Sequence, residues 1–248
     1  MIIKIYNGAG VSEESLKHSY NTLKLYTSSK YSISYISPEE IIRGTWIQET
    51  HLLVLPGGAD IHYARALNGP GNNLIKKFII QGGNFLGICA GSYYGGNYVE
   101  FAKSSNIEVT GKRELGLYNG TVRGPILCDY YYDSDRGARA AEIIINPNFN
   151  QHLKDCYVFY NGGGYFVNAE NISNTKILAK YNIANSYAAI IECKYGKGTA
   201  ILSGVHFEYD PNIMNSTSLY HIINILKESN QKRIMLLHYL FKILSIDH

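Results

Sequence analysis

The amino-acid sequence predicts an α/β fold with a mostly parallel central sheet and additional antiparallel strands in its second half. In the first half, short strand-like segments without polar alternation are separated by segments that keep a helical period. Strands that are apolar along their whole length are typical of parallel sheets covered by helices on both faces. Between residues 107 and 202 the segments are shorter and separated by Gly-rich turns, which indicates antiparallel pairing.

The N-terminal segment predicts a short buried strand followed by a capped helix. Ile2–Tyr6 forms the first expected strand. Ser12 is a suitable N-cap, and Glu13 and Glu14 would occupy the first helical turn, where the positive end of the helix dipole favours carboxylates. The helical period then continues through Leu16, Tyr20 and Leu23.

Three further strands and two helices complete the predicted parallel layer. Ser32–Ile36 is expected as a strand, and Pro38 suits the first turn of a short helix. Residues 52–55 form a fully apolar strand. The next helix ends at two glycines and carries Leu74, Ile75, Phe78 and Ile79. Asn84–Ile88 then returns as a strand and runs directly into Cys89.

The last part of the chain predicts a hairpin and two helices. Residues 195–199 (YGKGT) lie between two apolar runs and are interpreted as a hairpin turn, because a phosphate loop would need a longer Gly-rich stretch that opens a helix. Asn215 is expected to cap a helix that carries Leu219, Ile222, Ile223 and Leu226. A final helix is expected over residues 231–244.

The composition describes a soluble globular chain and excludes two classes of partner. The net charge is only +3 and the basic residues form no stripe, so no nucleic-acid partner is implied. No apolar run is long enough to span a bilayer and no signal peptide is recognisable, so no membrane association is expected. We expect a single domain over residues 1–248, with C-terminal helices from about residue 215. The 22 tyrosines are interpreted as a compositional bias, with a tyrosine-lined pocket as the alternative.

The cysteines are widely separated and form no Cys-x-x-Cys pair; they are Cys89, Cys128, Cys156 and Cys193. This spacing argues against both a zinc site and a disulfide framework, and no metal or other cofactor is predicted. Unpaired cysteines fit a reducing compartment, so a cytoplasmic location is expected.

Residues 87–91 (GICAG) have the pattern of a nucleophile elbow, in which a tight turn between a strand and a helix exposes one side chain. Small residues on both sides of Cys89 avoid collisions with neighbouring backbone in such a turn. A helix beginning near Ser92 would present its positive end to the sulfur and favour a thiolate. The alternative is a structural cysteine in a Gly-rich turn.

His206 and Glu208 follow an apolar strand, at the edge of the sheet where α/β folds collect active residues. A cysteine nucleophile needs a base and a third group that orients the base, and His-x-Glu provides both. The alternative is a surface histidine beside a solvated glutamate.

Residues 56–60 (PGGAD) follow another apolar strand and predict an oxyanion hole. The backbone N–H groups of Gly57 and Gly58, together with that of Ala90, would face a tetrahedral intermediate. The alternative is an ordinary turn at the end of a strand. A weaker set of pocket residues is Asp60, Tyr93, Asn161, Gly162 and Gly163, where the last three also fit a plain turn.

The three motifs together resemble the class I glutamine amidotransferase superfamily. The resemblance narrows to the N-terminal domain of eukaryotic biotin–protein ligases, because a series of motifs occurs in order over most of the chain: residues 6–8 (YNG), 56–60 (PGGAD), 87–91 (GICAG), 120–125 (GTVRGP), 137–140 (GARA) and 160–163 (YNGG). It implies a flavodoxin-like three-layer α/β/α sandwich. It also implies a triad of Cys89, His206 and Glu208 that cleaves a small amide or acyl substrate through a thioester, with Gly58 and Ala90 holding the oxyanion.

The chain departs from the superfamily pattern at Phe207, which stands where proline is usual, although the spacing is kept. No Gly-Arg-rich adenylate loop of a ligase is present, so biotin ligation is not predicted, and released ammonia would need a separate acceptor or ligase partner protein. Two alternatives to an amidase remain open. One is a relative of the protease and deglycase branch, and the other is a regulatory module that binds a small, biotin-related ligand.

Overall fold

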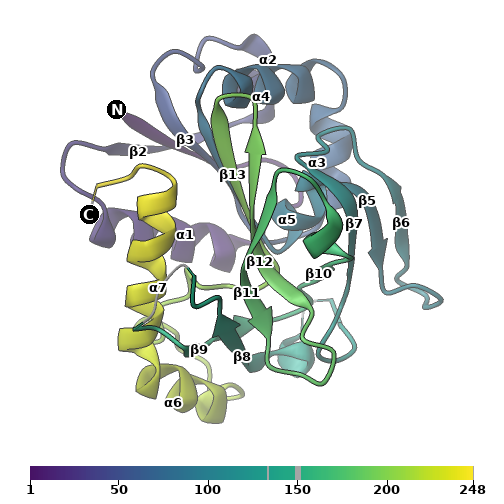
Figure 1. Ribbon diagram of the computed structural model, residues 1–248, viewed down its shortest axis with the longest axis vertical. Coiled ribbons are helices and arrows are strands. Elements are labelled where there is room, and N and C mark those ends of the chain that lie inside the picture. Colours follow the sequence, from purple (N-terminus) through teal and green to yellow (C-terminus); the bar gives the residue numbers. More distant parts are fainter. Residues whose placement is uncertain (133, 149–151, 248) are drawn as a thin grey trace.

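The computed structural model describes residues 1–132, 134–148 and 152–247. Its centre is a parallel sheet with the strand order β2-β1-β3-β4-β13 (Figure 1). These strands are β1 (Ile2–Tyr6), β2 (Ser32–Ile36), β3 (Thr50–Leu55), β4 (Asn84–Ile88) and β13 (Gly198–Ser203). Neighbours in this group all pair in parallel. The order is that of flavodoxin-like sheets, with its fifth strand supplied from late in the chain.

The sheet continues beyond β13 mainly through antiparallel strands, as expected for the second half of the sequence. The main path adds β12 (Ala188–Tyr195), β10 (Tyr165–Phe166), β7 (Tyr118–Gly124), β5 (Gly96–Phe101) and β6 (Val109–Lys112). A branch from β12 adds β11 (Thr175–Tyr181), β8 (Arg139–Ile145) and β9 (Asp155–Tyr160). One pair in this half, β5 with β7, is parallel.

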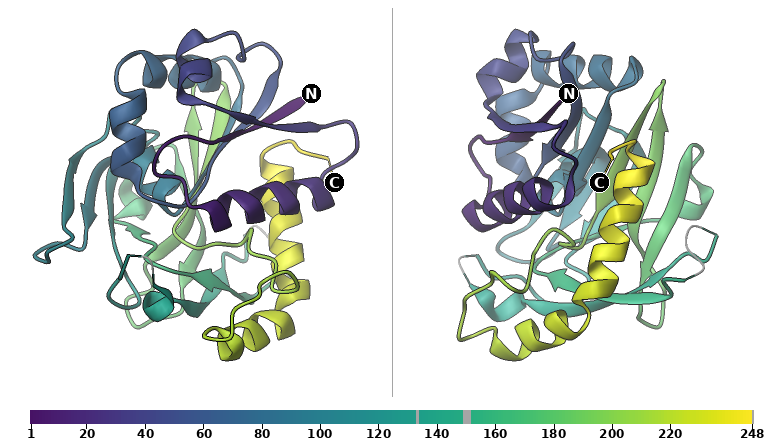
Figure 2. Two further views of the ribbon diagram at one scale, coloured as in Figure 1. Left: turned by 180° about the vertical axis from the view of Figure 1, so that it is seen from behind. Right: turned by 90° about the vertical axis from the view of Figure 1, so that its left-hand side faces the viewer.

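Helices cover both faces of the parallel strands, which gives three layers (Figures 1 and 2). One face packs against α1 (Glu13–Tyr26) and α7 (Asn230–Ile243). The other packs against α2 (Pro38–Arg43), α3 (Asp60–Leu67), α4 (Pro70–Ile80) and α5 (Ala90–Gly95). The remaining helix, α6 (Tyr220–Glu228), packs on β8 and β9, and short 3₁₀ turns lie at Asp135–Gly137 and Ala169–Asn171.

Strand β3 shows why the sequence specifies this layering. Successive side chains of a strand point to opposite faces of the sheet. Leu52 and Val54 pack with α1 and α7, whereas Leu53 and Leu55 pack with the helices of the opposite layer. All four side chains are fully buried. An uninterrupted apolar run is therefore required by two covered faces.

The structure differs from the sequence prediction at three helices. The helix α3 was not predicted, because Asp60 and His62 interrupt its apolar pattern. Asn215 does not cap a helix, since α6 begins at Tyr220 without a side-chain cap. The helix after Cys89 begins at Ala90 and ends at Gly95, where the backbone turns extended and enters β5. Among the described helices, none combines the length and apolarity that a membrane span requires.

Candidate active site

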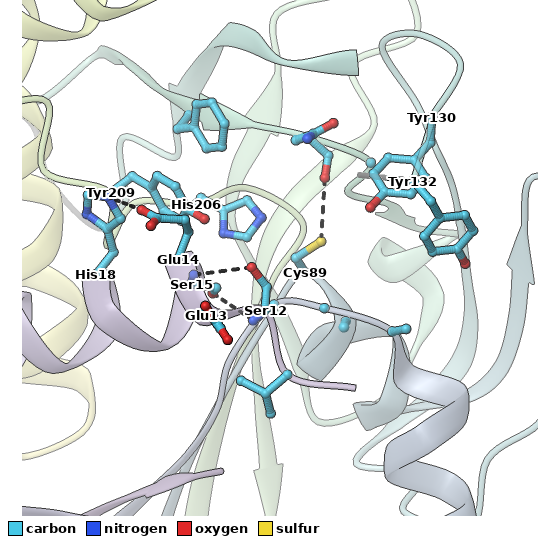
Figure 3. A pocket seen from close by; sticks show the side chains of 18 of the residues that line it. Ser12, Glu13, Glu14, Ser15, His18, Cys89, Tyr130, Tyr132, His206 and Tyr209 are labelled. Atoms are coloured by element: carbon cyan, nitrogen blue, oxygen red, sulfur yellow. Dashed lines mark hydrogen bonds and ion pairs between the residues drawn. The ribbon is translucent and has the colours of Figure 1, made fainter. Parts of the chain in front are cut away.

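A cavity of about 830 Å³ opens at the C-terminal ends of β3, β4 and β13 (Figure 3). These strand ends lie side by side because the three strands are adjacent and parallel. Most of the predicted site residues line the cavity: Gly57, Gly58, Asp60, Cys89, Ala90, Tyr93, Asn161, Gly162 and His206. Glu208 and Gly163 are not among its lining residues.

Cys89 occupies a sharp turn between β4 and α5. Its backbone has a positive φ of 48°, a conformation that costs free energy for any residue with a side chain and that recurs at functional sites. The turn is tightly packed: a Cβ atom on Gly91 would lie 2.1 Å from the carbonyl oxygen of Leu55. The small residues expected at an elbow are therefore needed for close backbone approach between the turn and β3.

The Cys89 sulfur points into the cavity, with His206 on one side and Tyr130 and Tyr132 on the other (Figure 3). The thiol is nearly buried, with 7% of the residue exposed, and its Sγ lies 3.8 Å from the carbonyl oxygen of Asn161. A substrate can therefore reach the sulfur only from within the cavity.

His206 and Glu208 form a buried pair in which Nδ1 of His206 lies 2.7 Å from Oε1 of Glu208. The backbone N–H of His206 donates to the carbonyl of Phe159, which fixes the segment against β9. Burial by itself lowers the pKa of His206. The negative charges of Glu208 and Cys89, and hydrogen bonds to both, outweigh burial and raise the pKa to about 10. A protonated His206 is therefore the favoured state at neutral pH.

Glu208 is held by residues of α1 that the sequence analysis did not identify. The Ser15 hydroxyl donates to Oε1 of Glu208 at 3.2 Å and accepts the backbone N–H of Gly57 at 2.8 Å. The Thr22 hydroxyl donates to the backbone carbonyl of Glu208 at 2.7 Å. A continuous hydrogen-bonded chain thus runs from the loop after β3 through Ser15 and Glu208 to His206.

Phe207 replaces the usual proline without disturbing the histidine and glutamate on either side of it. Its side chain is buried in the core and its carbonyl accepts a hydrogen bond from Nη1 of Arg233 at 3.0 Å. The pairing of His206 with Glu208 therefore depends on the two-residue spacing and on these anchors, and proline is not required.

The predicted oxyanion hole is corrected at one position. The N–H of Gly57 is already bound to Ser15, so it cannot receive an oxyanion. The N–H groups of Gly58 and Ala90 donate to no protein atom among the described residues, and both residues line the cavity. Gly58 has a φ of 147°, and a Cβ atom there would lie 1.9 Å from the carbonyl oxygen of Gly10, so only glycine fits.

Asp60 and Tyr93 lie in the cavity wall with their polar groups already paired. Asp60 accepts a hydrogen bond from Nε of Arg113 at 2.7 Å, although burial raises the pKa of this carboxyl group more than Arg113 lowers it. The Tyr93 hydroxyl donates to the carbonyl of Gly162 at 3.1 Å, and burial raises the pKa of this phenol well above its ordinary value. Both side chains shape the wall rather than offering free charge.

The Gly-rich segment after β9 contributes backbone to the cavity. The carbonyl of Asn161 faces Cys89, and its side-chain amide donates to the carbonyl of Ser134. Gly163 packs instead against the turn after β13, where a Cβ atom would lie 1.7 Å from the carbonyl oxygen of Gly204. Gly163 therefore holds two loops together, and the prediction that it lines the pocket is corrected.

An aromatic stack that no sequence motif predicts lies beside His206. The Tyr209 ring stacks on His18 with a centroid distance of 4.1 Å and on Phe159 at 4.5 Å, and its edge meets the His206 ring at 4.9 Å. Burial lowers the pKa of His18, so this ring is neutral within the stack. The available signal was a row of polar residues on the buried face of α1, at helical spacing: Ser15, His18, Ser19 and Thr22.

The four cysteines differ strongly in their surroundings, although all are free. Burial raises the pKa of Cys156 and of Cys193 to about 12, and it also raises the pKa of Cys128. Of the four, Cys89 is the one that lines the cavity. Within the described parts of the chain, no three His, Cys, Asp or Glu side chains gather as a metal site would require.

Comparison with known proteins identifies the family of the chain. The family model "Biotin-protein ligase, N terminal" matches residues 1–248. The chain belongs to this family. Biotin–protein ligase of Schizosaccharomyces pombe is 34% identical to this family member over 249 residues, which cover 99% of the chain and 38% of the yeast protein. An uncharacterised protein of Chlamydia muridarum is 35% identical over 213 residues, which cover 84% of the chain and 81% of that protein.

Several solved structures share the fold of this chain, although their sequences are at most 16% identical to it. PurLQS from Thermotoga maritima matches with a TM-score of 0.56 at 16% identity, covering 96% of this chain and 98% of the other. A GMP synthase-type protein from Thermoplasma acidophilum matches with a TM-score of 0.54 at 13% identity, covering 99% and 95%. The expected class I glutamine amidotransferase-like fold is therefore confirmed, and at these identities the likeness concerns the fold alone.

Proposed function

We propose that this protein is a cysteine-dependent hydrolase of the amidotransferase type, which cleaves an amide or acyl substrate through a thioester on Cys89. The observation that carries the proposal is the strained elbow cysteine beside the buried pair of His206 and Glu208. A thiolate–imidazolium pair is the activated form of such a nucleophile. A protein that only binds a ligand has no need for this pair.

In the first half of the reaction, the Cys89 thiolate attacks the acyl carbon and forms a C–S bond, while the carbonyl electron pair moves onto oxygen. The N–H groups of Gly58 and Ala90 stabilise this oxyanion. When the intermediate collapses, the C–N bond breaks and the His206 imidazolium donates a proton to the leaving nitrogen. Ammonia or an amine departs, and the acyl group remains on sulfur as a thioester.

In the second half, neutral His206 takes a proton from water as the water oxygen attacks the thioester carbon. The resulting oxyanion is held by the same two N–H groups. Collapse breaks the C–S bond, returns the thiolate to Cys89 and releases a carboxylic acid. Glu208 keeps the imidazole oriented and stabilises its protonated form in both halves.

Released ammonia would need an acceptor if the enzyme is a glutaminase in the cell. We propose that a separate ammonia-accepting or ligase partner protein provides this acceptor. A reducing compartment such as the cytoplasm suits a free thiol nucleophile.

Selective modification of Cys89 tests the proposal. We expect iodoacetamide at neutral pH to label Cys89 at least about tenfold faster than the other three cysteines, because only activated and accessible thiols react as thiolates. Intact-mass and peptide analysis, with Cys89→Ser as the control variant, would measure this. Equal and slow labelling of all four thiols contradicts an activated nucleophile. A glutamine-analogue diazoketone in a parallel reaction would show whether a glutamine-like acyl group is accepted.

A further inference from the structure

A continuous row of aromatic rings forms one side of the cavity, and we call it the aromatic wall: Tyr93, Phe101, Tyr130 and Tyr132. Neighbouring rings meet edge to face, with centroid distances of 5.6 Å from Tyr93 to Phe101, 5.6 Å from Phe101 to Tyr130 and 5.1 Å from Tyr130 to Tyr132. The wall begins at a buried residue, since Tyr93 is 3% exposed, and ends near the mouth at Tyr132, which is 47% exposed.

Tyr130 and Tyr132 of the wall lie on the opposite side of the Cys89 sulfur from His206 (Figure 3). His206 must protonate the leaving nitrogen, so the leaving group occupies the His206 side. The acyl group bonded to the same carbon then extends away from His206. This direction leads toward the aromatic wall, and Ile61 and Val109 also line the cavity.

The charges around the cavity do not suit a free amino acid on the wall side. The α-carboxylate of such a substrate would need a cation, and the single Lys or Arg among the lining residues is Lys17. Lys17 lies on α1, away from the wall, and its Nζ is 3.7 Å from Glu14. Of the cavity-lining carboxylates, Asp60 is already paired with Arg113, and Asp135 accepts hydrogen bonds from the hydroxyls of Ser216 and Ser218. Burying an unpaired α-carboxylate there would be unfavourable.

We propose that the aromatic wall is the acyl subsite of this enzyme, and that it takes an extended apolar or aromatic acyl group, presented as an amide. This inference rests on the proposed hydrolase function. The four rings present apolar faces and edges against which such a chain can be buried. A cavity of about 830 Å³ also has room for a group much larger than the side chain of glutamine.

The test compares amides of one fluorogenic aminocoumarin that differ only in their acyl group: acetyl, γ-glutamyl and phenylpentanoyl. We expect kcat/KM to be at least about tenfold higher for the phenylpentanoyl amide than for the other two, since each apolar contact in a pocket discriminates by factors of this size. Intact-mass analysis of the protein during turnover should show the phenylpentanoyl thioester on Cys89.

Two neighbouring tyrosines provide a matched pair of variants. Tyr132→Ala removes the outer end of the wall, and we expect kcat/KM for the phenylpentanoyl amide to fall about tenfold, mostly through KM, with the acetyl amide changed less than about twofold. Tyr131→Ala should leave both values unchanged. Tyr131 is similarly exposed, at 42%, but it stacks on Arg136 and does not line the cavity.

The outcomes separate the subsite from the proposed function. A preference for the γ-glutamyl amide, or an equal loss in both tyrosine variants, overturns the aromatic subsite and leaves the hydrolase intact. Absence of turnover with all three amides, together with slow labelling of Cys89 by iodoacetamide, removes the hydrolase function and the subsite with it.

Discussion

At the scale of single residues, the chemistry of the site depends on how three side chains share charge. His206 lies between Cys89 and Glu208, and burial makes each of these charges expensive on its own. In the proposed ion pair, the His206 cation is flanked by the Cys89 thiolate and the Glu208 carboxylate. This explains why the pKa of His206 rises although burial opposes the rise.

The raised pKa of His206 predicts an unusual pH dependence for the labelling of Cys89. The imidazolium persists until the pH approaches about 10. In the proposed thiolate–imidazolium pair Cys89 is ionised already at pH 7, so its alkylation rate should change little between about pH 7 and about pH 9, where an ordinary thiol becomes markedly more reactive because its pKa is about 8.5. The His206→Asn variant should recover the steep rise of an ordinary thiol. Iodoacetamide rates measured across this range would check this, and parallel profiles for the two proteins would contradict the ion pair.

At the scale of elements, α1 has a role that its periodicity alone does not reveal. Its buried face carries Ser15, His18 and Thr22, which contact the segment around Glu208 or the ring of Tyr209. Polar residues on the buried face of a helix need partners. Here the partners come from the loop after β13, so α1 positions the base of the proposed reaction.

Ser15 and Ser19 allow this role to be tested on one helix. Ser15→Ala leaves the N–H of Gly57 without its partner and removes a donor from Glu208, so we expect a loss of about 1–2 kcal/mol in the free energy of unfolding and about tenfold in kcat. Ser19→Ala should be nearly neutral, since the buried Ser19 hydroxyl has no hydrogen-bond partner within the described chain. Urea unfolding and steady-state kinetics would measure both. Similar effects of the two substitutions would contradict a positioning role for Ser15.

At the scale of the whole molecule, the C-terminal helix is joined to the site by one buried cation. Arg233 of α7 is 1% exposed, and its Nη1 donates to the carbonyl of Phe207, between His206 and Glu208. Its Nη2 lies 3.8 Å from a carboxylate oxygen of Asp210. The last helix therefore supports the segment that carries the proposed base, although α7 does not line the cavity.

Replacement of Arg233 should destabilise the fold through this link. In Arg233→Met, Asp210 loses its cationic neighbour and the carbonyl of Phe207 loses its donor, so we expect about 3 kcal/mol lower stability. The adjacent Lys232→Met is the control, because Lys232 is exposed and pairs with Asp155 at the surface, where ion pairs contribute little. Equal unfolding midpoints for the two variants in urea would show that Arg233 does not support this segment.

The sequence by itself determined the parallel layer and the motifs that meet at the candidate site. The strands β1, β2 and β4 have the predicted bounds, and the fully apolar run of residues 52–55 lies in β3, which is covered on both faces. The motifs Gly87–Cys89–Gly91 and His206–Glu208 each consist of residues close together in the chain, so they can be recognised from the sequence alone. The resemblance to the biotin-protein ligase N-terminal family was carried by such patterns and is confirmed.

Only the tertiary structure decided which distant groups pair with these motifs. The sequence could not show that Ser15 takes the N–H of Gly57, because the two residues meet only when α1 packs beside the end of β3. The aromatic wall likewise joins α5, β5 and the loop after β7. A hydrogen bond or ring contact requires proximity within a few ångströms, which the packing of elements creates and sequence spacing does not encode.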